Sequence, residues 1–64
     1  MKARVMLKIE EVTSMLGLSV SMVYKLMKNG EFPRPAKLGT ASRWPAEQVE
    51  KWLEEKIGEV GNGY

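Results

Sequence analysis

The chain has 64 residues, which is long enough for one small domain. It contains neither cysteine nor histidine, which excludes disulfide bonds and the usual thiolate or imidazole zinc sites. Its net charge is only +2, but residues 1–44 hold eight basic and three acidic residues (net +5), whereas residues 45–64 hold two basic and five acidic ones (net −3). The first part is therefore expected to face a polyanion and the second to face away, although two ordinary solvated surfaces would give the same counts. No apolar run approaches the roughly 20 residues of a membrane span and no signal-peptide pattern is present, so we expect a cytoplasmic protein without membrane contact.

The first helix is expected to begin at Lys8 or Ile9 and to end at Gly17. Carboxylates in its first turn favour the positive end of the helix dipole, and its apolar residues recur at helical spacing. A glycine at the end readily takes the left-handed conformation that closes many helices. Before this helix, Val5 and Leu7 are able to form a short strand that pairs with a later segment.

A second helix is expected at residues 19–29, after a turn of only three residues, GLS. Ser19 offers a hydroxyl that caps this helix, and Gly30 ends it. One side carries an apolar stripe expected to be buried, formed by Val20, Val23, Tyr24 and Met27. The other side is free of acidic residues and carries Ser21, Met22, Lys25, Lys28 and Asn29. Such a helix after such a turn is typical of the recognition helix of a helix-turn-helix, which enters the major groove of DNA.

The segment after the second helix contains Pro33 and Pro35, which exclude a helix there. Two short alternating segments then flank a glycine-led turn, and residues 36–44 are predicted to form a β-hairpin, or wing. Leu38 and Trp44 are expected to face the core, and Lys37 and Arg43 to face outward.

Pro45 is expected to open the last helix, whose apolar stripe is Val49, Trp52, Leu53, Ile57 and Val60. Gly58 and the glycines after it indicate fraying, so the ordered core is expected at about residues 6–57 and a flexible tail at 58–64. Phe32, Trp44 and Trp52 are expected in the core. The predicted fold is mainly α with a small β-hairpin: a winged helix-turn-helix in one compact domain spanning residues 1–64.

Three local signatures in this order carry a resemblance to a known family: LGLS-S--YKLMK-G-FP-P-KLG through the turn, second helix and wing entry, RW at the end of the hairpin, and V--WL in the last helix. Residues 6–57 resemble the AlpA-like phage regulatory proteins, within the excisionase-like group of MerR-type winged helix-turn-helix domains. The resemblance implies a DNA-binding protein of a prophage or mobile element that regulates excision or integrase-related transcription.

By position, the resemblance implies a recognition helix at residues 19–29 in the major groove and a wing at residues 36–44 on the adjacent backbone or minor groove. Base-facing residues would be Ser21, Met22 and Lys25, with Tyr24 and Lys28 as phosphate contacts. Arg34, between two prolines, is expected to be exposed and able to touch the backbone. The complete expected DNA-binding set is Ser19, Ser21, Met22, Tyr24, Lys25, Lys28, Arg34, Lys37, Thr40, Ser42 and Arg43.

The chain departs from the family pattern at three positions. Lys8 stands where Ser or Thr often caps the first helix, Val20 where Arg is common, and Met22 where Thr is common. The last two replace hydrogen-bonding groups by apolar ones, and Met22 is able to contact a thymine methyl group instead.

Several of these residues also have a plainer interpretation. Lys25 and Lys28 are typical of solubilising charges on a helix exterior, and Arg43 beside Trp44 also fits a cation–π or structural pair. Tyr24, at the edge of the apolar stripe, is expected to pack mainly in the core, with a hydroxyl that still reaches a phosphate.

Catalysis is not expected. The acidic residues of the last helix lie on its exposed side in a protein too small for a deep pocket: Glu47, Glu50, Glu54, Glu55 and Glu59. A Ser–His or Cys–His pair is impossible, and no phosphate-cradling glycine loop is present. We therefore expect that the protein is not an enzyme and that it has no catalytic residue, no cofactor and no metal.

The sequence leaves three functions open. The first is a sequence-specific double-stranded DNA-binding transcriptional regulator, filling repeated sites as cooperating copies. The second is an excisionase-type recombination directionality factor that bends DNA and works with a recombinase or integrase. The third, from another class, is a small protein-interaction module that docks through Trp52 or the acidic last helix.

Overall fold

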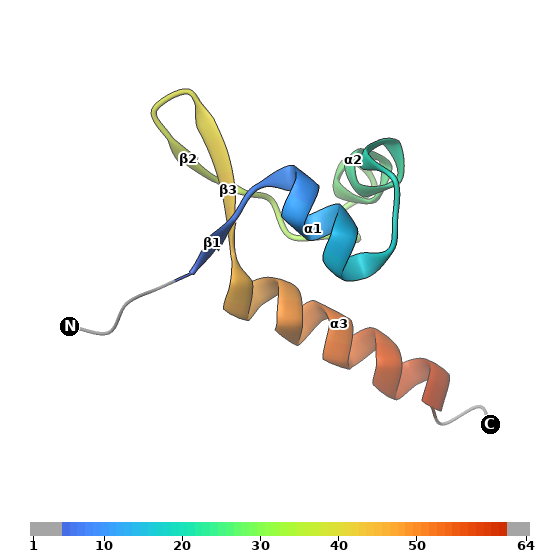
Figure 1. The fold of residues 1–64 in the computed structure, drawn as a ribbon. Coiled ribbons are helices and arrows are strands. Elements are labelled where there is room, and N and C mark those ends of the chain that lie inside the picture. The colour runs from blue at the N-terminus through green and yellow to red at the C-terminus, as the bar shows by residue number, and fades with distance from the viewer. Residues whose placement is uncertain (1–4, 62–64) are drawn as a thin grey trace.

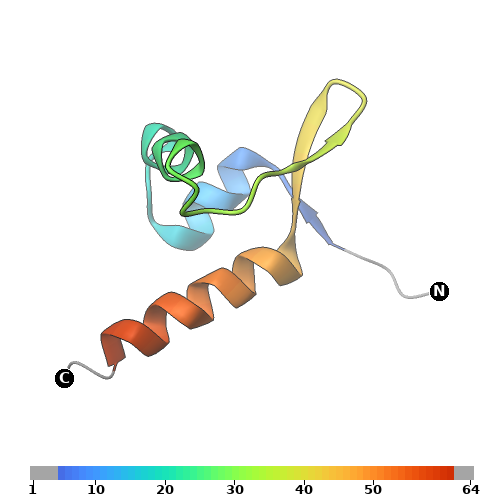
Figure 2. The same ribbon diagram turned by 180° about the vertical axis from the view of Figure 1, so that it is seen from behind.

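The computed structural model describes residues 5–61, which fold into three helices and three short strands (Figure 1). In chain order these elements are β1 (Met6–Leu7), α1 (Ile9–Leu16), α2 (Val20–Lys28), β2 (Ala36–Leu38), β3 (Ala41–Pro45) and α3 (Ala46–Gly61). α1 and α2 lie on one side of α3, and the β2–β3 hairpin projects beside them, as the view from behind in Figure 2 also shows. The predicted winged helix-turn-helix fold is confirmed.

α1 begins without a side-chain cap, because a lysine occupies the capping position. The backbone N–H of Lys8 instead donates to Glu11 Oε1 at 2.8 Å, so a carboxylate one turn ahead holds the start of the helix. At the other end Gly17 has a φ of 69°. There the N–H groups of Gly17 and Leu18 both donate to the carbonyl oxygen of Thr13, at 2.8 and 3.1 Å. The predicted start and end of the first helix are confirmed.

α2 has the side-chain cap that α1 lacks. The N–H of Met22 donates to Ser19 Oγ at 3.1 Å, as the sequence predicts. The helix closes with Gly30 at a φ of 74°, and the N–H of Glu31 donates back to the carbonyl oxygen of Leu26 at 2.7 Å. The turn between α1 and α2 therefore has well-defined hydrogen bonds on both sides, which sets the angle at which α2 is presented.

The three strands form an antiparallel sheet in the order β1-β3-β2. Leu7 pairs with Trp44, which confirms that the start of the chain forms a strand with a later segment. In the hairpin, Leu38 pairs with Ala41 across a two-residue turn. Partners in such a pair point to the same face, and faces alternate along a strand, so Leu38 lies on the face opposite to Trp44. The prediction that Leu38 faces the core is wrong, and its side chain is 54% exposed.

The core lies between α1, α2, the sheet and α3. Its buried residues come from every layer: Val12, Val23, Met27, Phe32, Trp44 and Val49. Partly buried apolar residues pack around them, among them Leu26 and Trp52. Two members of the predicted stripe of α2 are thus confirmed, but Val20 and Tyr24 are 43% and 49% exposed. The stripe of α2 is rotated toward Leu26, which leaves those two side chains at its open edge.

Two indole groups fix the proline-containing segment between α2 and β2. Trp44 Nε1 donates to the carbonyl oxygen of Pro33 at 2.9 Å, and Trp52 Nε1 donates to that of Glu31 at 2.6 Å. Between them, the Phe32 ring stands edge-on to Trp52 with centroids 4.9 Å apart. The wing is therefore attached to the helical layer by side chains as well as by the chain itself.

α3 begins one residue later and ends later than expected. Pro45 is the last residue of β3, and the helix continues through Gly58 to its end at Gly61. A single glycine costs only about 1 kcal/mol inside a helix, too little to end this one. Ile57 was expected in the buried stripe but is 60% exposed, because the later turns run past the α1–α2 layer (Figure 1). The Val60 side chain and residues 62–64 lie outside the described part.

Candidate nucleic-acid interface

The outward side of α2 is polar and cationic, as predicted. Four of the expected DNA-binding residues on this helix have exposed side chains: Ser21, Met22, Lys25 and Lys28. Its two lysines lie in the last turn, where a cation also favours the helix dipole, and the first turn holds no acidic residue. None of these four side chains belongs to the core, so the whole flank is available to a partner.

The wing carries the second group of expected residues. Lys37 Nζ donates to Ser42 Oγ at 2.9 Å across the two strands. Arg43 Nη1 donates to the carbonyl oxygen of Ser42 at 2.9 Å, which orients the guanidinium along β3. Arg43 is partly buried rather than fully outward, and Thr40 is exposed in the turn between the strands. Arg43 thus has a structural contact as well as free donors.

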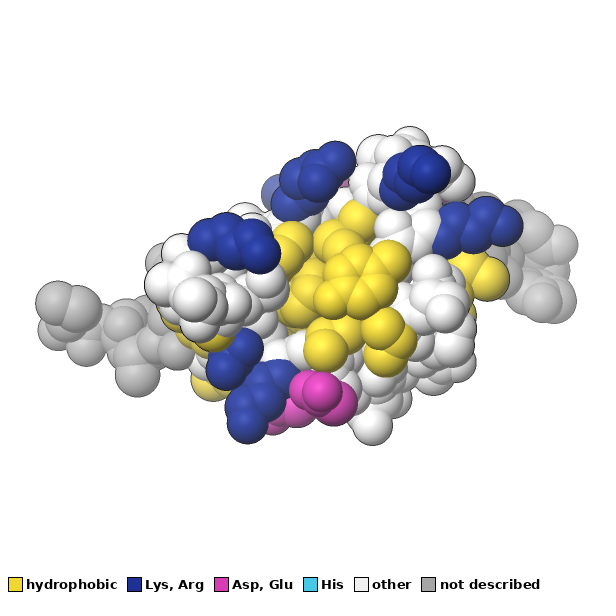
Figure 3. Space-filling view, turned by 90° about the horizontal axis from the view of Figure 1, so that it is seen from above, with side chains coloured by type: hydrophobic (Ala, Val, Ile, Leu, Met, Phe, Trp, Pro, Cys, Tyr) yellow, Lys and Arg dark blue, Asp and Glu magenta, His cyan; other side chains and the backbone are white. Residues whose placement is uncertain are grey.

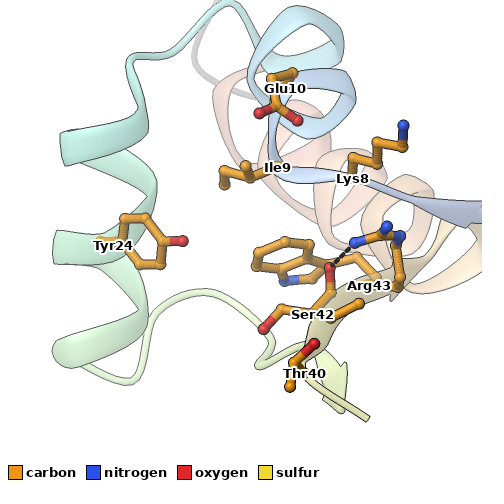
Figure 4. Close-up of a pocket in the computed structure, with 9 residues that line it drawn as sticks. Lys8, Ile9, Glu10, Tyr24, Thr40, Ser42 and Arg43 are labelled. Carbon is orange, nitrogen blue, oxygen red and sulfur yellow. Dashed lines mark hydrogen bonds between the residues drawn. The ribbon is translucent and has the colours of Figure 1, made fainter. Parts of the chain in front are cut away.

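A groove separates α2 from the wing and is closed at one end by the start of α1. It has a volume of about 690 Å³ and is lined by Lys8, Ile9, Glu10, Tyr24 and residues 40–44. Figure 4 shows the Tyr24 side chain pointing from α2 into this space, toward the side chains of the wing. Tyr24 therefore faces a groove, and the expectation that it packs mainly in the core is wrong.

Basic side chains surround this groove on the face that presents α2 and the wing. The space-filling view from above shows an apolar centre with Lys and Arg side chains around it and acidic side chains mainly at one edge (Figure 3). α3, which carries all five acidic residues of residues 45–64, lies on the far side (Figure 1). The charge asymmetry of the sequence is thus a difference between two sides of the folded domain.

The structure brings together only part of the expected set. Tyr24, Thr40, Ser42 and Arg43 line one groove. The other expected residues of α2 are exposed but are not among the groove residues. Arg34 is exposed in the segment before β2 but is not among the groove residues. The expected set lacked Lys8 and Glu10, which reach the groove because β1 pairs with β3.

The described residues offer neither a metal site nor a membrane span. Residues 5–61 contain no group of three or more His, Cys, Asp or Glu side chains placed to hold a metal ion. Within the same part of the chain, no helix combines the length and the apolar character that crossing a membrane requires.

Comparison with known proteins gives a consistent picture. Residues 5–57 match the family described as prophage CP4-57 regulatory protein (AlpA). The chain is also 36% identical over 59 residues to the uncharacterized protein ORF88 of Enterobacteria phage P4, an alignment that covers 91% of this chain and 67% of the phage protein. No solved structure gives a significant match. A match over this much of the domain shows that the chain belongs to the AlpA family of phage regulatory proteins, a regulatory rather than an enzymatic family.

Proposed function

We propose that this protein is a sequence-specific double-stranded DNA-binding regulator of transcription in a prophage or mobile element. The observation that carries the proposal is that α2, with its exposed lysines, and the wing border one groove on one face, while the acidic helix α3 lies behind them. Phosphate neutralisation by Lys and Arg supplies much of the affinity of such proteins. Bound to its target, the protein is expected at the nucleoid.

In the proposed complex α2 enters the major groove, which is wide enough for a helix, and the wing lies on the adjacent backbone or minor groove. Ser21, Met22 and Lys25 face base edges. Lys28 and the hydroxyl of Tyr24 contact phosphates, which fix the position of the helix without reading sequence. The 42% exposed Met22 offers an apolar surface for a thymine methyl group, in place of a hydrogen bond.

Among the wing residues, Lys37, Thr40, Ser42 and Arg43 are proposed to contact the backbone or the walls of the minor groove. Ser19, at the start of α2, and Arg34, in the segment before β2, are proposed as further backbone contacts. A single module of this size buries only about 600–1,000 Å² of interface, which limits the affinity of one copy. Repeated sites, filled cooperatively by adjacent copies, would overcome this limit.

The direct test measures binding to a duplex selected from random sequences, over a range of salt concentrations. Binding that neutralises n phosphates gives a log–log slope of about −0.9n. Lys25→Glu and Arg43→Ala are expected to weaken binding while the melting temperature changes little. Lys51→Glu, on an exposed lysine of α3, makes the same charge change away from the proposed interface and is expected to bind normally. No detectable binding at low salt, or parallel losses of folding and binding in both variants, would refute the proposal.

α3 supports a second candidate role beside the first. It lies away from the proposed DNA and carries the 60% exposed Ile57 among acidic residues, so it is able to dock a partner protein such as a recombinase. In an excisionase-type function the protein would bend its site and recruit that recombinase. A circular-permutation gel assay distinguishes the excisionase-type function from the first one. If the protein bends its site, the complex with the site at the middle of the DNA fragment migrates most slowly.

A further inference from the structure

We propose that the groove between α2 and the wing holds one sugar–phosphate strand of the duplex, and that Lys8 binds a phosphate there. This inference rests on the proposed function and adds a third element, α1, to the expected contacts. Lys8 stands at the start of α1 and lines the groove with Tyr24 on one wall and Arg43 on another. Figure 4 shows Tyr24 pointing into this space, with Lys8 and Arg43 at the opposite rim and the Lys8 side chain extended outward.

The position of the groove fits the path of a DNA backbone. One sugar–phosphate strand separates a major groove from the minor groove beside it. If α2 occupies the first and the wing the second, that strand must pass between α2 and the β2–β3 hairpin. The space between them in this domain is the groove, which is open rather than filled by side chains. An open channel in this place is what the proposed mode of binding requires.

The lining of the groove also offers several donors for phosphate oxygens. Ser42 Oγ accepts a hydrogen bond from Lys37 Nζ, so the hydroxyl proton of Ser42 remains available to donate. Arg43 uses Nη1 on a backbone carbonyl, and the other N–H groups of its guanidinium remain available. The hydroxyl of Tyr24 points into the same space (Figure 4). Neutral donors and cations together form a suitable lining for a phosphodiester.

Lys8 completes this lining from the side of α1. Its backbone N–H is used in the contact with Glu11, but no hydrogen bond between described residues uses its ammonium group. A lysine at this position is poor at capping α1, since its side chain has no acceptor for the first N–H groups. A phosphate contact explains what the ammonium group does at this position.

Glu10 is the one acidic residue in the described lining, and its charge opposes a phosphate in the groove. Its carboxylate stabilises the first turn of α1, and it also lowers the affinity for any duplex irrespective of sequence. The two neighbouring charges on α1 are therefore expected to act on DNA binding with opposite signs.

The magnitudes follow from counterion release. One lysine–phosphate contact contributes about 0.9 to the slope of log affinity against log salt concentration. At 0.1 M salt such a contact therefore strengthens binding about eightfold compared with 1 M salt. Lys8→Gln is expected to bind about eightfold more weakly at 0.1 M and to reduce the slope by about 0.9. Glu10→Gln is expected to bind more tightly, by roughly two- to fivefold, on specific and non-specific duplexes alike.

The experiment measures binding of the wild type, Lys8→Gln, Glu10→Gln and the control Lys51→Gln by fluorescence anisotropy, with thermal melting of each variant. A second set of duplexes carries an uncharged methylphosphonate at one linkage at a time. If Lys8 binds a phosphate in the groove, the loss caused by Lys8→Gln disappears at one or two adjacent linkages and persists at all others. Lys51→Gln is expected to match the wild type throughout.

The outcomes separate this inference from the proposed function. Absence of wild-type binding at low salt overturns both. Normal wild-type binding that Lys25→Glu weakens, with Lys8→Gln and Glu10→Gln both equal to the wild type, overturns the inference and leaves the function intact. Opposite shifts in the two α1 variants, together with a methylphosphonate position that removes the effect of Lys8→Gln, support it.

Discussion

Ser19 allows folding and DNA binding to be separated at a single position. Its hydroxyl accepts the side-chain hydrogen bond that caps α2, from the N–H of Met22 at 3.1 Å, and the residue is exposed beside the proposed DNA. Ser19→Ala removes this acceptor, at a cost of about 1 kcal/mol. In a domain of this size that cost lowers the melting temperature by about 4–8 °C. Ser19→Asp keeps an acceptor of equal capping strength and adds a negative charge where the helix dipole favours it.

The two variants are therefore expected to have opposite effects: Ser19→Ala lowers stability more than DNA affinity, and Ser19→Asp lowers DNA affinity but not stability. Ser19→Asp should melt at or above the wild-type temperature, yet its charge repels the backbone of a bound duplex. One unfavourable charge near a phosphate offsets about one lysine contact, so affinity should fall about eightfold at 0.1 M salt. Ser19→Ala, measured well below its melting temperature, should bind much more tightly than Ser19→Asp. Circular dichroism melting and fluorescence anisotropy provide the two measurements.

A matched control uses Gln48→Glu, which adds the same charge at an exposed position on α3. It is expected to bind DNA as the wild type does. Equal affinities for Ser19→Asp and the wild type would show that the start of α2 does not approach the backbone. A melting temperature for Ser19→Asp as low as that of Ser19→Ala would contradict the capping argument.

Three further predictions concern stability and are measured by urea denaturation. Gly58→Ala is expected to raise the free energy of unfolding by about 0.5–1 kcal/mol, because Gly58 lies inside α3 and an added Cβ meets no atom within 4 Å; a decrease would show that the helix does not extend through this residue. Gly39→Ala is expected to lower it by about 1 kcal/mol, because Gly39 has a φ of 68° in the hairpin turn; an unchanged value would mean that the turn relaxes without strain. Leu38→Thr is expected to change the free energy of unfolding by less than about 0.5 kcal/mol, because that side chain is 54% exposed. A loss of about 2 kcal/mol or more would show that Leu38 is buried.

The ends of α1 and α2 could be predicted from the sequence because the signals are local. Ser19, Gly17 and Gly30 act on backbone groups within one turn of themselves, and the structure has them in those roles. The hairpin was predictable for the same reason, since Gly39 favours a tight turn between two short alternating segments.

Burial was harder to predict because it depends on what lies opposite. Leu38 was assigned to the wrong face because the faces of a hairpin depend on its register. Tyr24 fits the helical spacing of the buried stripe, yet it faces the groove that the wing leaves open. Ile57 continues the stripe of α3 past the layer that would cover it. Spacing along one element cannot reveal where the neighbouring element ends.

In the candidate site, too, local features could be predicted and features that depend on distant parts of the chain could not. The cationic face of α2 was visible in the sequence, because its residues follow one another along a single helix. Lys8 and Glu10 lie more than 30 residues before Arg43, and only the pairing of β1 with β3 brings them to the same groove. A contact that depends on so distant a pairing has no local signature.

The position of β1 also affects what shortened forms of the chain would do. β3 is the middle strand, paired through Leu7 on one side and through the hairpin on the other. A product that starts after Leu7 would leave β3 with an unpaired edge, whose free N–H and C=O groups are a template for a strand from another chain. Such a product is expected to self-associate by pairing of its exposed strand edges, and its first measurable defect would be aggregation on concentration.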